Sequence, residues 1–162
     1  MALAQFYLED GHQNLAAAAA QAKVAIGLDP ARVAAYAVVA VYHADRGEWG
    51  ELESVLQAAL RTVPDDAVPY YRAAERLLAA DPKRAERYLR VYLAQEPEGN
   101  QPTAAEAHWK LGTALEAQGR AGDALNEFQE SMRLDPESKA APDFKRLSST
   151  HPTVASSKAR PK

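Results

Sequence analysis

The stretch HWKLGTALEAQGRAGDALNEFQESMRLDP, residues 108–136, decides the fold of this chain. It contains two runs in which apolar residues recur every three or four positions, which is the spacing of an amphipathic helix. The sequence AQGRAG separates the two runs, and the dipeptide DP closes the second, because proline cannot continue a helix. The stretch therefore predicts two short helices joined by a tight turn.

Proline recurs at a nearly constant interval along the chain. Pro30, Pro64, Pro97 and Pro136 each close a comparable segment, and the intervals are 34, 33 and 39 residues. A period near 34 residues is typical of arrays of stacked two-helix hairpins. The longest interval holds the extra stretch EGNQP at 98–102, which we interpret as a loop insertion.

The turns inside these units carry signals of their own. Gly47 and Gly119 each lie 17 residues before a closing proline, and glycine readily adopts the left-handed conformation that ends many helices. The third unit turns through AADPKR instead, where Asp81 can cap the next helix and Pro82 can fill its first position. The stretch TAAE at 103–106 fits a capping box at the start of the fourth unit.

These signals predict an all-α solenoid of four helix-turn-helix repeats and a short C-terminal capping helix. The expected helices cover residues 1–10, 14–28, 32–46, 49–63, 67–80, 82–95, 103–118, 121–134 and 142–149. The repeats cover about 1–30, 31–64, 65–97 and 103–136, and the solenoid as a whole covers 1–149. Each hairpin carries an apolar stripe that it cannot bury alone, so neighbouring units must stack. Residues 150–162 have no apolar period, and we expect them to form a disordered tail.

The fourth unit resembles the tetratricopeptide repeat (TPR) family. The family's signature positions are occupied there by Leu111, Gly112, Leu115, Ala124, Phe128, Ser131 and Pro136. His108 stands where the family usually has tryptophan, and Trp109 follows it. The resemblance covers about 1–136 and implies a right-handed superhelix whose concave groove, lined by the first helix of each unit, binds peptides or helices of partner proteins. Pentatricopeptide repeats have a similar period but bind RNA and are usually basic, which the net charge of −3 argues against.

The composition excludes several classes of function. A chain of 162 residues with a pI of about 5.8 has no positive field to gather nucleic acid. It has no cysteine, so disulfides and thiolate chemistry are absent. No apolar run approaches the ~18 residues of a membrane span, so we expect no membrane insertion. The opening MALAQFYLED lacks the features of a signal peptide and resembles the middle of a helix, so we expect the natural chain to extend upstream of Met1.

The sequence shows no catalytic motif, and we expect a non-enzymatic protein without cofactor or metal. The histidines stand at no metal-ligand spacing, and the glycines form no phosphate-binding loop. We interpret His43 as a packed ring between helices, and Trp49 and Phe128 as core residues. The use of alanine, and of arginine over lysine, suggests a GC-rich bacterial source, while cytoplasm and periplasm both remain open.

The resemblance to TPR proteins implies a set of residues lining the groove. Tyr71 and Trp109 hold equivalent positions in adjacent units and are expected to form an exposed aromatic pair, with Arg72 and Lys110 as a basic pair beside it. The full set of expected groove residues is Leu8, Val38, Val41, Tyr71, Arg72, Glu75, Trp109, Lys110 and Thr113.

Three functions fit this sequence. The first is a scaffold that binds a partner peptide or helix in an apolar concave groove. The second is a self-associating array, a homo-oligomer, or a repeat array that acts as a spacer. The third is an accessory TPR region of a larger multidomain enzyme.

Overall fold

The computed structural model of this chain describes residues 14–95 and 102–151, and within them every regular element is an α-helix. The expected helix at 1–10 and most of the expected tail at 150–162 lie outside the described residues. In chain order the helices are α2 (Leu15–Leu28), α3 (Val33–Arg46), α4 (Trp49–Thr62), α5 (Val68–Leu77), α6 (Pro82–Leu93), α7 (Ala104–Ala117), α8 (Ala121–Leu134) and α9 (Ala140–Thr150).

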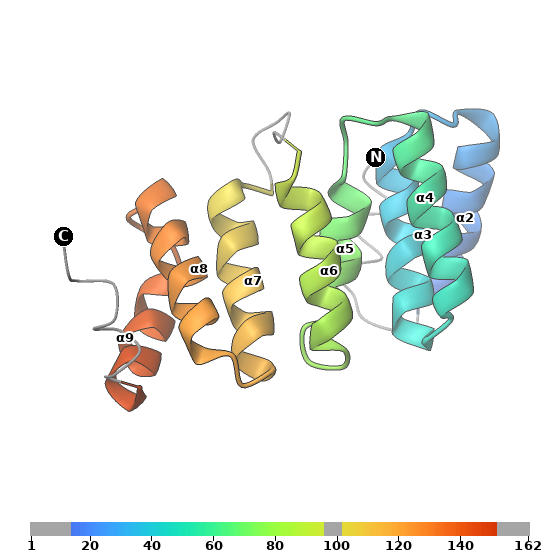
Figure 1. Ribbon diagram of the computed structural model, residues 1–162. Helices are drawn as coiled ribbons and strands as arrows, with labels where there is room; N and C mark the ends of the chain where they lie inside the picture. Colours follow the sequence, from blue (N-terminus) through green and yellow to red (C-terminus); the bar gives the residue numbers. More distant parts are fainter. Residues whose placement is uncertain (1–13, 96–101, 152–162) are drawn as a thin grey trace.

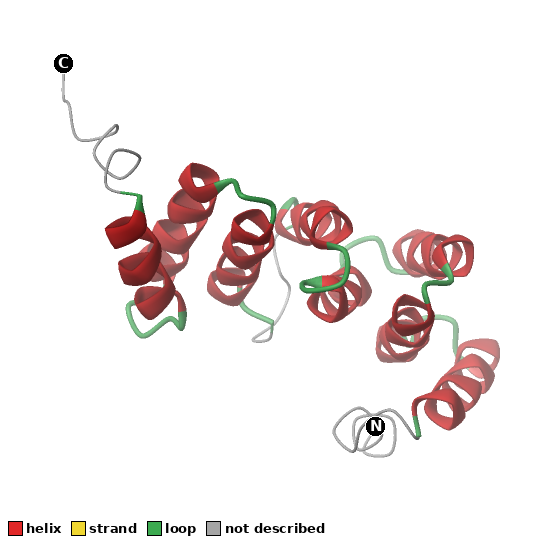
Figure 2. Ribbon diagram, turned by 90° about the horizontal axis from the view of Figure 1, so that it is seen from below, coloured by secondary structure: helices red, strands yellow, loops and turns green. Residues whose placement is uncertain are grey.

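The helices form a single row of stacked hairpins, from α2 at one end to α9 at the other (Figure 1). Seen along the helix axes, the row has two layers and is curved (Figure 2). Helices α3, α5, α7 and α9 lie on the inside of the curve and are called the inner layer. Helices α2, α4, α6 and α8 lie on the outside and are called the outer layer. The all-α solenoid expected from the sequence is confirmed.

The prolines of the sequence period fix the ends of the outer-layer helices. Helices α2, α4 and α8 each have 14 residues, and Pro30, Pro64 and Pro136 follow two positions after their last residues. The intervening residue leaves the helical region in each case, with φ between −143° and −132° and ψ between 86° and 105°. This is the conformation that a following proline imposes, so the period of the prolines sets the period of the helices.

The turns also have the conformations that their residues predict. Gly47 and Gly119 adopt positive φ angles of 68° and 74°. The side chain of Asp81 accepts a hydrogen bond from the backbone N–H of Arg84 at the start of α6. Thr103 and Glu106 form the expected capping box at the start of α7. Helix α9 begins two residues before the expected position 142 and ends at Thr150.

The largest core cluster runs through α3 to α9 and is built on close approach of paired helices. Phe128 of α8 is fully buried, and its ring lies directly over Gly112 of α7. A Cβ atom added at Gly112 would be 2.5 Å from two carbons of that ring. The absence of a side chain at this position therefore allows α7 and α8 to pack at their observed distance.

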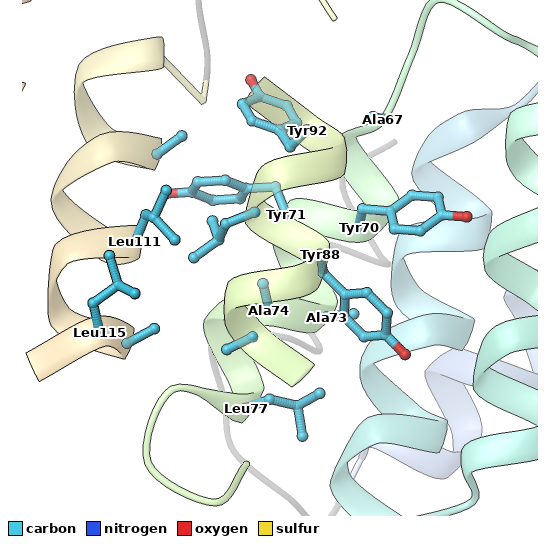
Figure 3. Close-up of a cluster of buried hydrophobic side chains, with 14 of the residues drawn as sticks. Ala67, Tyr70, Tyr71, Ala73, Ala74, Leu77, Tyr88, Tyr92, Leu111 and Leu115 are labelled. Atoms are coloured by element: carbon cyan, nitrogen blue, oxygen red, sulfur yellow. The ribbon is translucent and has the colours of Figure 1, made fainter. Parts of the chain in front are cut away.

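Tyrosines join three helices in the middle of the row. The rings of Tyr70 on α5 and Tyr88 on α6 meet edge to face, with centroids 5.7 Å apart, and Figure 3 shows both among the buried side chains. The hydroxyl of Tyr88 donates a hydrogen bond to Glu53 of α4 over 2.7 Å. Burial, and then the hydrogen bond to Glu53, raise the pKa of Tyr88 well above its usual range, so this phenol remains a donor.

The N-terminal end of the row has a smaller core. There Ala18 and Ala22 of α2 pack against Ala35, Val38 and Val39 of α3 in a separate cluster. Alanine side chains leave little volume between the helices, so α2 and α3 approach closely. No helix in the described ranges is both long and apolar enough to cross a membrane.

Candidate partner-binding face

The first helices of the hairpins lie side by side in the inner layer, so the residues expected to line a groove come from neighbouring elements. Val38 and Val41 lie on α3, Tyr71, Arg72 and Glu75 on α5, and Trp109, Lys110 and Thr113 on α7. Leu8 lies outside the described residues.

Two of the expected contact residues are buried, which corrects the sequence prediction. Tyr71 is only 2% exposed because its ring packs against Tyr92 of α6, with centroids 5.2 Å apart. Figure 3 shows it extending from α5 toward Leu111 of α7. Val38 is also 2% exposed, because it belongs to the small core with α2. The expected exposed aromatic pair is therefore wrong: Tyr71 supports the face from below and offers no ring to a partner.

Trp109 is half-buried and held in a fixed orientation. Its indole N–H donates a hydrogen bond to the Asp143 carboxylate of α9 over 2.9 Å. The ammonium groups of Lys110 and Lys139 lie 5.0 and 5.6 Å from its ring centroid, within the range of cation–π attraction. The indole is thus positioned between α7 and α9 before any partner arrives.

Glu75 links the two basic residues of the expected set. Its carboxylate contacts Arg72 at 3.1 Å and Lys110 of the next hairpin at 2.9 Å. Burial alone would raise the pKa of Glu75, but the hydrogen bonds and charges of Lys110 and Arg72 outweigh burial and hold that pKa below its ordinary range. Arg72 and Lys110 are therefore not free cations, as the sequence suggested, but members of a charge network.

Further ion pairs continue this network along the inner layer. Asp45 of α3 pairs with Arg76 of α5, and Glu116 of α7 pairs with Arg146 of α9 at 2.6 Å. With the pair of Glu75 and Lys110, an ion pair bridges each described junction from α3 to α9, and we call this series of pairs the inner-layer ladder. The expected contact face was predicted to be apolar, and the described residues of the inner layer instead combine apolar and charged side chains.

Sequence reasoning missed the contribution of α9 to this face. Lys139, Asp143 and Arg146 all contact inner-layer residues of α7. Asp143 lies 34 positions after Trp109, which is one repeat period. The period could therefore have identified α9 as a partial fifth repeat that continues the face, in addition to a cap.

Val41 and Thr113 are partly exposed at the edges of the face. The hydroxyl of Thr113 donates a hydrogen bond to the backbone carbonyl of Trp109 over 3.1 Å. Of the expected contact residues, Val41, Arg72, Glu75, Trp109 and Thr113 are partly exposed, whereas the side chain of Lys110 is only 13% exposed.

Comparison with known proteins finds the same architecture in solved structures. PilF of Pseudomonas aeruginosa matches with a TM-score of 0.70 and 20% sequence identity, over 93% of this chain and 67% of PilF. MamA matches with a TM-score of 0.66 and 16% identity, over 96% of this chain and 88% of MamA. A double mutant of MamA from RS-1 gives a TM-score of 0.63 and 21% identity, over 94% and 85% of the two chains. PilF and MamA are both TPR proteins. This chain has the TPR fold.

The likeness is one of structure. No protein-family model matches the sequence, and no curated protein is similar enough in sequence to be matched. Two positions depart from the TPR signature, as the sequence indicated. Ser131 is fully buried and donates a hydrogen bond to the carbonyl of Ala105 over 2.7 Å, so its polar group is satisfied. His108 stands half-buried beside Glu127, with 2.7 Å between Nδ1 and the carboxylate.

His43 and Trp49 each contact a neighbouring side chain within the fold. His43 is 7% exposed, and its Nδ1 lies 2.7 Å from the Glu48 carboxylate at the turn between α3 and α4. Trp49 was expected in the core, but it is 38% exposed, with the Arg84 guanidinium 4.1 Å from its ring centroid. Within the described ranges, no group of three or more acidic or histidine side chains could hold a metal ion.

Proposed function

We propose that this chain is a non-catalytic protein-interaction scaffold, and that it binds a peptide or helix of a partner protein on the inner-layer face around Trp109. The TPR fold supports the general role, since such solenoids present extended concave surfaces. The observation that carries the proposal is the fixed orientation of a half-buried indole between α7 and α9. Trp109 combines a large apolar surface with a preset position, which reduces the entropy lost on binding.

The chemistry around Trp109 indicates the kind of segment that would bind. The partner would place an apolar side chain on the indole, because this is the largest apolar group that the described face leaves accessible. It would carry an acidic residue to contact Lys139, which is exposed and whose ammonium lies 5.6 Å from the ring centroid, whereas Lys110 is already paired with Glu75. An exposed ionic contact of this kind contributes ~1 kcal/mol or less, so the indole supplies more of the affinity.

Site-specific photo-cross-linking tests this assignment. A photoreactive residue is placed at Thr113, on the inner layer beside Trp109, and in a matched protein at Gln129, which is exposed on the outer-layer helix α8. We expect a partner to be cross-linked from position 113 and not from position 129. Equal cross-linking from both positions would move the site away from the inner layer.

A substitution series at Trp109 separates contact from support. Trp109→Phe keeps an aromatic ring but loses the N–H that bonds Asp143, whereas Trp109→Ala removes the ring as well. We expect capture of the cross-linked partner to survive in the Phe variant and to be lost in the Ala variant, with both retaining the helical circular dichroism of the parent. Capture that is unchanged in the Ala variant would overturn the assignment of Trp109.

A further inference from the structure

Helix α9 buries little apolar surface. It is the last helix of the described row (Figure 1), and all of it lies within the described residues. Its buried side chains are those of Ala140 and Leu147, and Phe144 packs partly buried against the same core cluster. Leu147 is thus the one large side chain of this helix that is buried. The apolar burial that holds the other helices in the array is therefore weak here.

The sequence of α9 gives the helix little stability of its own. It has 11 residues, and isolated helices shorter than about 12–15 residues are marginal in water. Its last three residues are Ser148, Ser149 and Thr150, whose hydroxyls donate to carbonyls of the preceding turn. Such residues are weak helix formers. Helix α9 is therefore expected to be helical only while it is docked.

Polar contacts supply much of the attachment of α9 to α7. The Arg146 guanidinium donates hydrogen bonds to both carboxylate oxygens of Glu116, over 2.6 and 2.8 Å. Asp143 accepts the indole N–H of Trp109 and contacts Arg146 at 3.2 Å. The side chains of Arg146, Glu116 and Asp143 are 53%, 27% and 31% exposed. Contacts between groups this exposed each stabilise little.

We propose that α9 undocks and unfolds as one unit while α7 and α8 stay folded, and that a partner bound at Trp109 holds α9 in its docked position. The second half of this inference rests on the proposed function. Local opening of this kind is typical of elements that are held by few buried apolar contacts and many exposed polar ones.

Undocking of α9 changes the Trp109 site directly. The indole loses Asp143 as its acceptor, and the Lys139 ammonium, which lies 5.6 Å from the ring centroid, leaves with the helix. The ring is then no longer held in one orientation, so a partner loses more conformational entropy when it binds the undocked form. A partner that contacts both Trp109 and Lys139 therefore binds the docked form more tightly, and by linkage it stabilises docking by the same factor.

Hydrogen exchange of the full chain, followed by mass spectrometry, tests the undocking. In the parent, the amides of α9 should exchange about tenfold or more faster than those of α7 and α8. Asp143→Ala removes both contacts of this carboxylate and should accelerate exchange in α9 by about fivefold or more. Asp143→Asn keeps an oxygen for the indole N–H and should have a smaller effect. Exchange of α9 at the rate of α7 in the parent would overturn the proposal.

Asp123→Ala is the matched control. Asp123 stands in the first turn of α8 as Asp143 does in α9, and it pairs with Arg120. Its removal costs the same kind of helix-end charge and ion pair, but none of the contacts of α9 with Trp109. Exchange in α9 should therefore match that of the parent. Equal acceleration of α9 by Asp123→Ala and Asp143→Ala would contradict the role of the polar contacts.

Trp109 fluorescence shows whether undocking reaches the site. Trp49→Phe leaves Trp109 as the only tryptophan, because the chain has two. In this background Leu147→Ala removes the large buried side chain of α9 and should undock the helix in most molecules. Quenching of Trp109 by acrylamide should then rise and its emission should shift to longer wavelengths, while α7 and α8 keep their slow exchange. Unchanged quenching, or loss of slow exchange in α7 and α8 together with α9, would overturn the proposal.

The partner that is captured from position 113 tests the coupling. Its binding to the parent should slow exchange in α9, and Leu147→Ala should weaken its capture by about tenfold. Capture that is lost in Trp109→Ala but unchanged in Leu147→Ala would leave the proposed function standing and overturn the coupling. Capture that is unchanged in Trp109→Ala would overturn the proposed function and the coupling together, whereas the exchange and quenching results would still decide whether α9 undocks.

Discussion

Gly112→Ala tests the account of how α7 and α8 approach each other. The added Cβ atom would lie 2.5 Å from two ring carbons of Phe128 and 3.2 Å from the carbonyl oxygen of Ala124. Carbon atoms in ordinary contact are about 3.5–4.0 Å apart, so the helices must separate by roughly 1 Å or the ring must leave its rotamer. Such overpacking costs about 1–3 kcal/mol.

The substitution also has a favourable effect that works against the clash. Alanine is a better helix former than glycine by about 0.5–1 kcal/mol. We expect the clash to prevail and to lower the free energy of unfolding by about 1–2 kcal/mol, which for a chain of this size lowers Tm by roughly 2–8 °C. The measurement is urea and thermal unfolding followed by circular dichroism.

Gly27→Ala is the matched control, because nothing lies within 4 Å of a Cβ atom added at Gly27 of α2. Only the gain in helix propensity remains there, so this variant should be stabilised by about 0.5 kcal/mol. The two Gly→Ala changes should therefore have opposite signs. Removal of the ring by Phe128→Ala should also abolish the penalty of Gly112→Ala in the double mutant. A Gly112→Ala protein as stable as its parent would refute the packing described here.

Three further predictions follow from the structure. Leu56→Ala, at a fully buried position of α4, should lower the free energy of unfolding by about 2–5 kcal/mol in urea denaturation; parent-like unfolding would mean that the site collapses without a cavity. Gly119→Ala, at a turn residue with φ of 74°, should cost about 1 kcal/mol in the same assay, because the alanine Cβ is strained in that conformation. Burial raises the pKa of Glu86, but hydrogen bonds from Gln118, Arg90 and Arg120 bring it below the ordinary 4.5. The stabilisation is therefore complete above about pH 4.5 and lost as the pH falls through the lowered value; Glu86→Gln should flatten this acid limb of a Tm-against-pH curve, and an unchanged limb would contradict the assignment.

The period of the sequence was enough to predict the fold, because local signals fix each turn independently. Pro30, Pro64 and Pro136 set helix ends through the conformation of a single preceding residue, and Gly47 and Gly119 end helices through their own φ angles. None of these effects depends on long-range packing. The order of helices and the hairpin arrangement could therefore be predicted before any contact was known.

The exposure of individual side chains could not be predicted in the same way. Tyr71 and Trp109 hold equivalent positions in the repeat, yet Tyr71 is buried and Trp109 is half-exposed. The difference arises from their neighbours: Tyr92 of α6 packs against the first ring, whereas the second meets the short polar helix α9. Trp49 illustrates the reverse case: it was expected in the core, but as the first residue of α4 it is 38% exposed, with the Arg84 guanidinium over its ring. The exposed fraction of a side chain in a repeat array depends on the residues of the adjacent unit, so it cannot be predicted from the position within the repeat alone.

The inner-layer ladder gives the array a direction. At every junction from α3 to α9 the acid belongs to the earlier hairpin and the base to the later one, as in the pairs Asp45 with Arg76 and Glu116 with Arg146. The pairs do not share one position of the repeat, however: the residue 34 positions before Arg76 is Tyr42, and the residue 34 positions before Arg146 is Gly112. A tandem copy of the hairpin that carries Asp45 or Glu116 would therefore bring no base opposite that acid. Each joint is specific to the two units that it connects, so duplicating or exchanging a hairpin would break ion pairs of the ladder.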